Sequence, residues 1–414
     1  MLDRPASSSL HHPPVPGAAA GALEGRTILQ IVPRLDGGGA ERTTLDIASA
    51  LVQAGARAVV ASEGGRLVAD LQARGGVFVP FPAATKNPLA MALATLRLRR
   101  LMAEEGADLV HVRSRAPGWV ALWACRGAGV PLVTTWHGAY GGRTAVKQRY
   151  NSVMARGDVV IANSQWTAGV IARSYPEAAP RVAAIPRGVD LRAFSPDAVE
   201  PERVRRLRAE WGAEPGDRVV LAPARLARRK GHLILVQAAR KLKNLGGDLV
   251  FVCAGDADGH GSVRAEIERA AKAAGLGRRV RCVGFCSDMP AAYLAASAVA
   301  VPSVEPEAFG RVAAEAQAMG VPVVVTDLGA AVETVLAPPQ VSAAQRTGWR
   351  VKPGDPKALA DGLAEALGLG AAARDALAAR ARAHVASRFS LDRMTGATLE
   401  IYARLIEHSQ TRLG

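Results

Sequence analysis

Two glutamates, Glu307 and Glu315, stand eight positions apart in the stretch EPEAFGRVAAE, with a Phe309-Gly310 turn between them. The first acid precedes an expected helix and the second lies inside it. Because an ionised carboxylate accepts two hydrogen bonds from neighbouring hydroxyls, two acids at this spacing could hold both ends of one hydroxyl-rich ligand. The alternative interpretation is a pair of surface acids on an ordinary alanine-rich helix.

The backbone between the two acids offers a second kind of contact. The N–H groups of Phe309, Gly310 and Arg311 lie at the expected start of the helix, where the first N–H groups have no acceptor inside the helix. Together with the positive end of the helix dipole they favour an anion such as a phosphate oxygen. Gly310, which has no side chain, permits close approach.

In the N-terminal half, the stretch DGGGAE places three glycines where an apolar strand meets a helix. A glycine turn lets the backbone N–H groups of Gly38 and Gly39 approach a phosphate or a sugar. A plain tight turn is the alternative. The dinucleotide-binding pattern G-x-G-x-x-G is absent, because Glu41 and Arg42 occupy its later positions.

The elements that must position these residues alternate between short apolar runs and helical segments. Near-continuous apolar strands separated by helices are typical of a parallel sheet covered on both faces. We therefore predict an α/β fold with two Rossmann-like, doubly wound parallel-sheet domains that face a cleft, where ligands bind beyond the carboxyl ends of the strands. The expected strands lie within residues 27–33, 56–62, 76–81, 107–112, 131–138 and 158–164, and then within 218–225, 248–256, 279–285, 298–304 and 321–327.

A chain of 414 residues exceeds the size at which one core keeps growing, so two domains are expected. A Pro-rich, charged stretch between the two strand series marks the linker. The last stretch is typical of one or two helices that could pack back on the N-terminal domain. The predicted division is a disordered tail (1–25), an N-terminal Rossmann-like domain (26–196), a linker (197–217), a C-terminal Rossmann-like domain (218–373) and C-terminal helices (374–414).

The net charge of +15 lies mostly in the N-terminal half, where residues 26–196 carry 21 Lys and Arg against 11 Asp and Glu. The basic stretches 96–100, 111–116 and 141–149 could meet an anionic membrane leaflet or a polyanionic substrate, and a solvated surface is the alternative. Nucleic acid is not an expected partner, because no ribonucleoprotein or zinc-finger signature accompanies the charge. Four irregularly spaced cysteines and no membrane-length apolar stretch indicate a cytoplasmic protein.

Seven stretches carry a resemblance to a known family. They are GGGAE (37–41), TTWHG (134–138), ANSQWT (162–167), PRGVDLRAF (186–194), PARLARRKG (223–231), the run 301–335 and TGWRVKPGD (347–355). Their order is similar to that of the retaining nucleotide-sugar glycosyltransferases of family 4 (glycosyltransferase group 1), which have the GT-B fold and include bacterial lipopolysaccharide and glycolipid enzymes. The resemblance covers about residues 27–390.

The resemblance implies a role for each residue that it aligns. Glu307 would hold hydroxyls of the transferred sugar, and Glu315 the ribose hydroxyls. Arg225 and Lys230 would stabilise the negative charge that develops on the leaving diphosphate. His137 would lie beside the transferred sugar without acting as general base.

The implied reaction is hexosyl transfer, with retention, from a nucleotide-sugar donor bound by the C-terminal domain to a glycan or lipid-linked acceptor bound by the N-terminal domain. The basic N-terminal domain would then place the protein peripherally at the inner face of the plasma membrane. A phosphate oxygen of the leaving group would accept the proton. No cofactor or metal is expected, although Asp256 and Asp258 form a D-x-D pattern of the kind that binds manganese in another glycosyltransferase fold.

The resemblance gives two positions no single role, and three rival functions stay open. Arg187 replaces the asparagine that is usual in this family segment, so its loop could contact an anionic group or merely differ at the surface. Glu333 matches a further family acid, to which the resemblance assigns no role. The rivals are another GT-B enzyme such as a nucleotide-sugar epimerase or a phosphorylase, a non-catalytic carbohydrate-binding protein, and an NAD-dependent oxidoreductase. The missing dinucleotide pattern disfavours the last.

Overall fold

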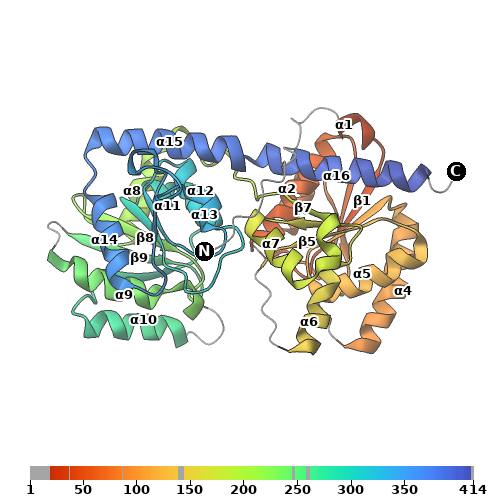
Figure 1. The fold of residues 1–414 in the computed structure, drawn as a ribbon, viewed down its shortest axis with the longest axis horizontal. Helices are drawn as coiled ribbons and strands as arrows, with labels where there is room; N and C mark the ends of the chain where they lie inside the picture. Colours follow the sequence, from red (N-terminus) through yellow and green to blue (C-terminus); the bar gives the residue numbers. More distant parts are fainter. Residues whose placement is uncertain are drawn as a thin grey trace, which may run out of the picture. The chain divides into compact units, whose positions relative to one another are not determined.

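A computed structural model describes residues 19–36, 38–85, 87–138, 144–244, 248–257 and 262–411 (Figure 1). Over these ranges the strands form two sheets, and every strand pair with a defined register is parallel. The prediction of two parallel-sheet α/β domains is confirmed. Every helix within the described ranges is too short or too polar to cross a lipid bilayer.

The first sheet contains seven strands of the described chain, in the order β3-β2-β1-β4-β5-β6-β7. The winding direction reverses between the neighbours β1 and β4. Every residue of β1, β4 and β5 is buried, as expected for apolar strands in the middle of a parallel sheet. The strands are β1 (Thr27–Ile31), β2 (Arg57–Ser62), β3 (Val77–Pro80), β4 (Leu109–Val112), β5 (Leu132–Trp136), β6 (Val159–Ala162) and β7 (Val182–Ala184).

Helices connect these strands, as the alternating pattern predicts. The longest, α4, begins after Asn87, whose side chain accepts hydrogen bonds from the N–H groups of Leu89 and Ala90, and ends at Gly106. The helices are α1 (Ala19–Ala22), α2 (Gly39–Gln53), α3 (Val68–Ala73), α4 (Pro88–Glu105), α5 (Arg115–Ala128), α6 (Ala145–Asn151) and α7 (Gln165–Ser174).

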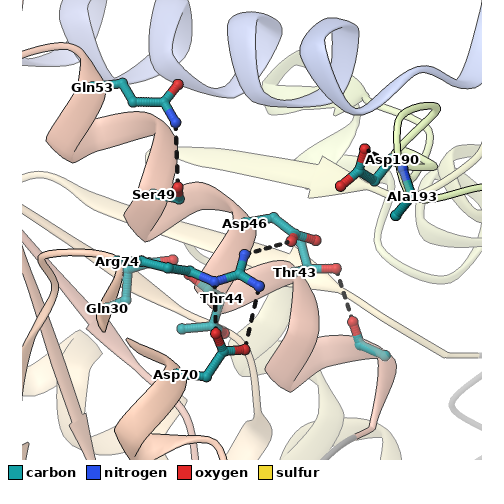
Figure 2. A network of polar contacts seen from close by, with 11 residues as sticks. Gln30, Thr43, Thr44, Asp46, Ser49, Gln53, Asp70, Arg74, Asp190 and Ala193 are labelled. Carbon is teal, nitrogen blue, oxygen red and sulfur yellow. Dashed lines mark hydrogen bonds and ion pairs between the residues drawn. The ribbon is translucent and has the colours of Figure 1, made fainter. Parts of the chain in front are cut away.

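Polar contacts tie α2 to its neighbours (Figure 2). Arg74, which follows α3, pairs with Asp70 of α3 at 3.0 Å and approaches Asp46 of α2 at 3.8 Å. On β1, Gln30 Nε2 donates to the carbonyl oxygen of Thr44 in α2 at 3.1 Å. These contacts fix α2 relative to both β1 and α3.

A buried polar cluster joins α16 (Leu391–Thr411) to the first sheet. Arg113 follows β4, is 4% exposed, and donates from Nη2 to Oε1 of Gln30 at 2.6 Å. Tyr402 of α16 is fully buried and hydrogen-bonds Nδ1 of His111 on β4. The last helix is therefore part of the core that contains β1 and β4.

Burial dominates the electrostatics of this cluster. It lowers the pKa of Arg113, although Tyr402 and Asp46 act in the opposite direction, and it raises the pKa of Tyr402. The basic stretch 111–116 was expected to add to a charged face. Arg113 contradicts that expectation, because neutral partners hold its guanidinium inside the domain.

Within the described residues, the second sheet contains six strands in the order β10-β9-β8-β11-β12-β13. Two apolar clusters that share its strands form the core of this half. The strands are β8 (Arg218–Pro223), β9 (Leu249–Ala254), β10 (Val280–Gly284), β11 (Ala298–Val301), β12 (Val323–Thr326) and β13 (Trp349–Val351). The helices are α8 (Pro201–Glu210), α9 (His232–Lys241), α10 (Ser262–Ala273), α11 (Met289–Leu294), α12 (Arg311–Ala318), α13 (Ala331–Thr334), α14 (Pro356–Leu367) and α15 (Ala371–Phe389).

Two predicted boundaries differ from the structure. The expected linker 197–217 contains α8, and its residues Leu207 and Trp211 are buried in the second core, because the apolar side chains outweigh the charged composition around them. The expected tail 1–25 is ordered from residue 19 onward, where Leu23 is fully buried. Residues 1–18 lie outside the described ranges.

By compactness the chain divides into two units. The first unit takes the described residues of 1–134, 157–159 and 392–414, and the second takes those of 135–156 and 160–391. The first sheet lies within residues 27–184 and the second within 218–351. The division into units therefore cuts through the first sheet, because it places β7 and parts of β5 and β6 in the second unit. The domain boundary drawn at residue 196 stays a prediction.

The Tyr402 hydroxyl should contribute measurably to stability. Tyr402→Phe leaves His111 and Arg113 without this buried partner, and we expect the free energy of unfolding to fall by about 1–3 kcal/mol in urea titrations. Arg404→Ala, at an exposed position of the same helix, is the matched control. Equal stability of the two variants would show that the hydroxyl adds nothing.

Candidate functional site

Lys230 and Glu307 come from two different loops and form an ion pair. The distance from Lys230 Nζ to Glu307 Oε1 is 2.5 Å, and Ser303 Oγ donates to the same oxygen at 2.6 Å. The two charged side chains are only 17% and 22% exposed. A partly buried carboxylate therefore lies between an ammonium group and a hydroxyl.

The approach of the two loops depends on a glycine at position 231. Gly231 follows Lys230 with φ at 71°, in the left-handed region, and a Cβ there would overlap the carbonyl oxygen of Pro302. The neighbouring backbone is joined by a hydrogen bond of 2.9 Å from Val304 N–H to the Arg229 carbonyl. Any larger residue would force apart the loops that carry Lys230 and Ser303.

A second glycine holds the backbone of Glu307. Gly329 has φ at 66°, and a Cβ at this position would overlap the carbonyl oxygen of Glu307. The next residue, Ala330, donates its N–H to that carbonyl at 2.9 Å. Glu307 is thus fixed from the β12–α13 loop while Lys230 approaches from the β8–α9 loop.

Opposing effects determine the ionisation of Glu307. Burial alone would raise the pKa of this carboxyl, but the charge and hydrogen bond of Lys230, the hydroxyl of Ser303 and the charge of Arg229 outweigh it, so the pKa is lowered. Glu307 is therefore a carboxylate at neutral pH. Such a group accepts hydrogen bonds from ligand hydroxyls.

Glu315 lies inside α12 and is 8% exposed. Its Oε2 accepts a hydrogen bond of 2.8 Å from Tyr293 Oη, and its Oε1 lies 3.9 Å from Arg311 Nε. Burial and the nearby Glu315 charge raise the pKa of Tyr293, so its hydroxyl stays protonated and donates. The sequence did not point to Tyr293, because it lies 22 positions before Glu315 and a strand and a loop separate the two residues.

The start of α12 presents donors of two kinds. Gly310 is the N-cap residue, and the first N–H groups of a helix have no acceptor within it. Arg311 adds a side chain whose Nε and Nη2 are buried and make no hydrogen bond within the described ranges. Phe309 is 3% exposed and packs edge-on against Phe389, so only its backbone is a candidate for ligand contact. The arrangement suits an anion.

The three arginines of the basic stretch after β8 are all exposed but have different partners. Arg225 is exposed on the loop that leads from β8 to Lys230. Arg228 is also exposed and pairs with Glu266 at 2.6 Å. Arg229 is exposed and contributes to the lowered pKa of Glu307 by its charge alone.

His137, which follows β5, accepts a hydrogen bond at Nδ1 from Arg187 Nη2 at 2.9 Å. A guanidinium can only donate, so Nδ1 is the acceptor and the neutral ring carries its proton on Nε2. The loop of Arg187 is held by Val189, which exchanges backbone hydrogen bonds of 2.8 and 2.9 Å with Phe389 and Leu391. In this state Nε2 of His137 cannot take up a proton.

Gly38 and Gly39 lie in the first unit, at the start of α2. Gly38 has φ at −76°, an ordinary value for any residue, and a Cβ there would overlap the carboxylate of Glu41. An acid of the same helix thus lies beside the N–H groups that were expected to meet a ligand. Gly37 lies outside the described residues.

Two further polar residues belong to the second unit. Glu333 accepts hydrogen bonds from the N–H groups of Gln165 and Trp166 at 2.8 and 2.6 Å, and burial raises its pKa despite these donors. The sequence analysis did not identify Ser303 as a site residue, although its position four residues before Glu307 was a usable signal.

No group of three metal-ligating side chains occurs in the described chain, and Asp258 of the D-x-D pattern lies outside it.

Two family models match the chain. One, described as Glycosyltransferase Family 4, matches residues 37–193, and the other, described as Glycosyl transferases group 1, matches residues 204–384. A D-inositol 3-phosphate glycosyltransferase of Salinispora tropica is 32% identical over 344 residues, which is 78% of this chain and 69% of that protein.

Solved structures share the fold over nearly their whole length. A glycosyltransferase from Rickettsia africae has 31% identity and a TM-score of 0.83, and the match covers 92% of this chain and 99% of that one. Anabaena HepE, solved in complex with UDP and glucose, has 25% identity and a TM-score of 0.78, over 91% and 99% of the two chains.

The ion pair makes stability depend on pH in a defined direction. Because the pKa of Glu307 is lowered on folding, its contribution is present above the unfolded pKa and is lost as pH falls through the folded pKa. Lys230→Met should lower the free energy of unfolding by about 1.5–3 kcal/mol at pH 7 and by less in acid. Arg228→Met is the control at an exposed ion pair, and a loss independent of pH would contradict the assignment.

The contact between Arg187 and His137 predicts a single imidazole tautomer. In Arg187→Met this donor to Nδ1 is gone, so His137 should populate both tautomers. Nitrogen-15 NMR of labelled histidine measures this, with His137→Gln to assign the signal and exposed Arg192→Met as control. Unchanged imidazole shifts in Arg187→Met would show that Arg187 does not set the tautomer.

Proposed function

This chain belongs to glycosyltransferase family 4, and we propose that it transfers a hexose from a nucleoside diphosphate sugar to an acceptor hydroxyl with retention of anomeric configuration. Its two family matches and its GT-B fold make it a glycosyltransferase. The observation that carries the finer proposal is the Lys230–Glu307 pair, in which a carboxylate is kept ionised beside a cation in a partly buried site.

In this proposal the donor is bound by charge complementarity. Lys230 and Arg225 supply positive charge to the leaving diphosphate, and Glu307 accepts hydrogen bonds from hydroxyls of the hexose. The first N–H groups of α12 and the buried donors of Arg311 support a second phosphate contact. Glu315, held by Tyr293 and Arg311, is proposed to bind the ribose hydroxyls.

The chemistry proposed for the bond-breaking step is transfer on the same face of the sugar. As the bond between the anomeric carbon and the diphosphate oxygen breaks, the acceptor oxygen bonds to that carbon and its proton passes to a phosphate oxygen of the leaving group. The tautomer of His137 supports this route, because a ring with its proton on Nε2 can donate there to a sugar oxygen but cannot act as the base.

Two acceptor classes remain as proposals. A glycan or lipid-linked acceptor, as in lipopolysaccharide synthesis, agrees with the excess of basic residues in the N-terminal half. The relative from Salinispora tropica, named for inositol 3-phosphate, favours a small phosphorylated polyol as the second candidate. Both classes offer a hydroxyl nucleophile near negative charge.

The donor proposal is tested with UDP-, GDP- and ADP-hexoses. Glu307→Ala and Lys230→Met should each lower kcat/KM by about 100-fold or more, because each removes charge that the donor needs. Arg228→Gln, at the exposed neighbouring pair, should stay near wild type. Circular dichroism checks the fold of each variant, and full activity of Glu307→Ala would refute the assigned site.

Product analysis by proton NMR then separates the remaining alternatives. The anomeric coupling constant of the new glycoside should match that of the donor if configuration is retained. Inverted product would contradict the same-face step, and epimerised donor without transfer would favour an epimerase. Supplying inositol phosphate and a lipid-linked glycan side by side decides between the acceptor classes.

A further inference from the structure

The helix α4 (Pro88–Glu105) has an apolar outer face in addition to its apolar inner face. Three leucines of this helix are largely exposed: Leu89 is 79%, Leu93 69% and Leu96 62% exposed. Their spacing of four and three residues places them on one side of the helix. We call these three residues the leucine stripe.

Folding of the domain does not account for the leucine stripe. The inner face of α4 already supplies the core with buried residues, namely Met91, Ala94, Thr95, Leu98, Leu101 and Met102. The outer face of a helix on a soluble domain is normally polar. A contiguous group of exposed large apolar side chains marks a surface that binds something else.

Arginines border the leucine stripe. Arg97, Arg99 and Arg100 are all exposed, and we call them the arginine rim. Arg97 donates to the carbonyl oxygen of Pro80 at 3.1 Å and Arg99 to that of Trp123 at 3.1 Å, so backbone carbonyls outside the helix hold two of the three guanidinium groups in place. The third, Arg100, pairs with Glu104 at 2.7 Å in solvent.

A tryptophan extends this surface onto α5 (Arg115–Ala128), which packs beside α4 (Figure 1). Trp123 is 43% exposed, and its ring lies 5.7 Å from that of Trp119. Tryptophan is enriched where proteins meet the headgroup region of a bilayer, because one part of its ring is apolar and its N–H is polar.

We propose that the leucine stripe and the arginine rim form a docking surface for an anionic phospholipid bilayer. The leucines would enter the boundary between headgroups and acyl chains, and the arginines would contact lipid phosphates while their apolar stems lie along the membrane surface. Each cation near an anionic leaflet adds about 1 kcal/mol of attraction, so the rim and the stripe act together. Such binding is peripheral and reversible.

Charge favours a bilayer over a second copy of the chain. If two copies paired through this face, their arginine rims would be brought together, and the Glu104 carboxylate that pairs with Arg100 offsets only one of the three rim charges in each copy. An anionic leaflet presents the opposite charge over a wide area. Docking is separate from sugar transfer, because the stripe and rim include none of the residues proposed for the reaction.

The test is co-sedimentation of the full chain with vesicles, without any substrate. Wild type should bind vesicles of phosphatidylcholine mixed with phosphatidylglycerol, bind phosphatidylcholine alone much more weakly, and lose binding as salt is raised. The triple variant Leu89→Ser/Leu93→Ser/Leu96→Ser should bind at least about tenfold more weakly. Arg100→Glu should also weaken binding, by about tenfold, because it reverses a charge in the rim.

Phe285→Ser is the matched control, since Phe285 is a large apolar residue that is 49% exposed in the second unit. Thermal unfolding checks that the triple variant folds. Its transition should match that of wild type, because all three positions face solvent. Vesicle binding by the triple variant equal to that of wild type would overturn the proposal. A second outcome would also overturn it: wild type does not bind vesicles but forms a dimer in analytical ultracentrifugation, and the triple variant is a monomer. That result would assign the leucine stripe to contact with a second copy.

Discussion

The close approach of two loops at Gly231 and Pro302 is the constraint on which the site in the second unit depends. It brings the ammonium group of Lys230 to the carboxylate of Glu307, where the limited exposure of both side chains strengthens their attraction compared with water. Burial alone would raise the pKa of Glu307 and favour its neutral form, and the charge of Lys230 is the largest of the effects that lower that pKa instead. Glu307 therefore stays ionised because Lys230 is present.

The pairing also prepares the site for an anionic ligand. In the proposed donor complex, a diphosphate at Lys230 would meet an ammonium group that is only 17% exposed, so less solvent would be reorganised on binding. Glu307 would keep Ser303 as a partner there, and its remaining lone pairs would accept hydrogen bonds from sugar hydroxyls. Glu315 is positioned in a similar way inside a helix, by the hydrogen bond from Tyr293 and the nearby charge of Arg311.

Hydrophobic periodicity predicted most of the strands, because buried parallel strands need nearly continuous apolar residues. It failed at α8, where Leu207 and Trp211 carry the packing inside a charged stretch, and it could not show that Arg113 would be buried. The motifs identified Lys230 and Glu307 as residues of interest, but their contact depends on glycine conformations in two loops. The motifs could not identify Tyr293, since no motif includes it and only the fold brings it to Glu315.

The position of α16 has a consequence for biosynthesis. Tyr402 completes the core around β1 and β4, yet the ribosome delivers it only after the whole second sheet has been made. Until then the nascent N-terminal strands lack their covering helix and Arg113 lacks its tyrosine neighbour. The core of the unit that is synthesised first is therefore completed only when the end of the chain has been made. Chaperone protection of the growing polypeptide would matter most during that interval.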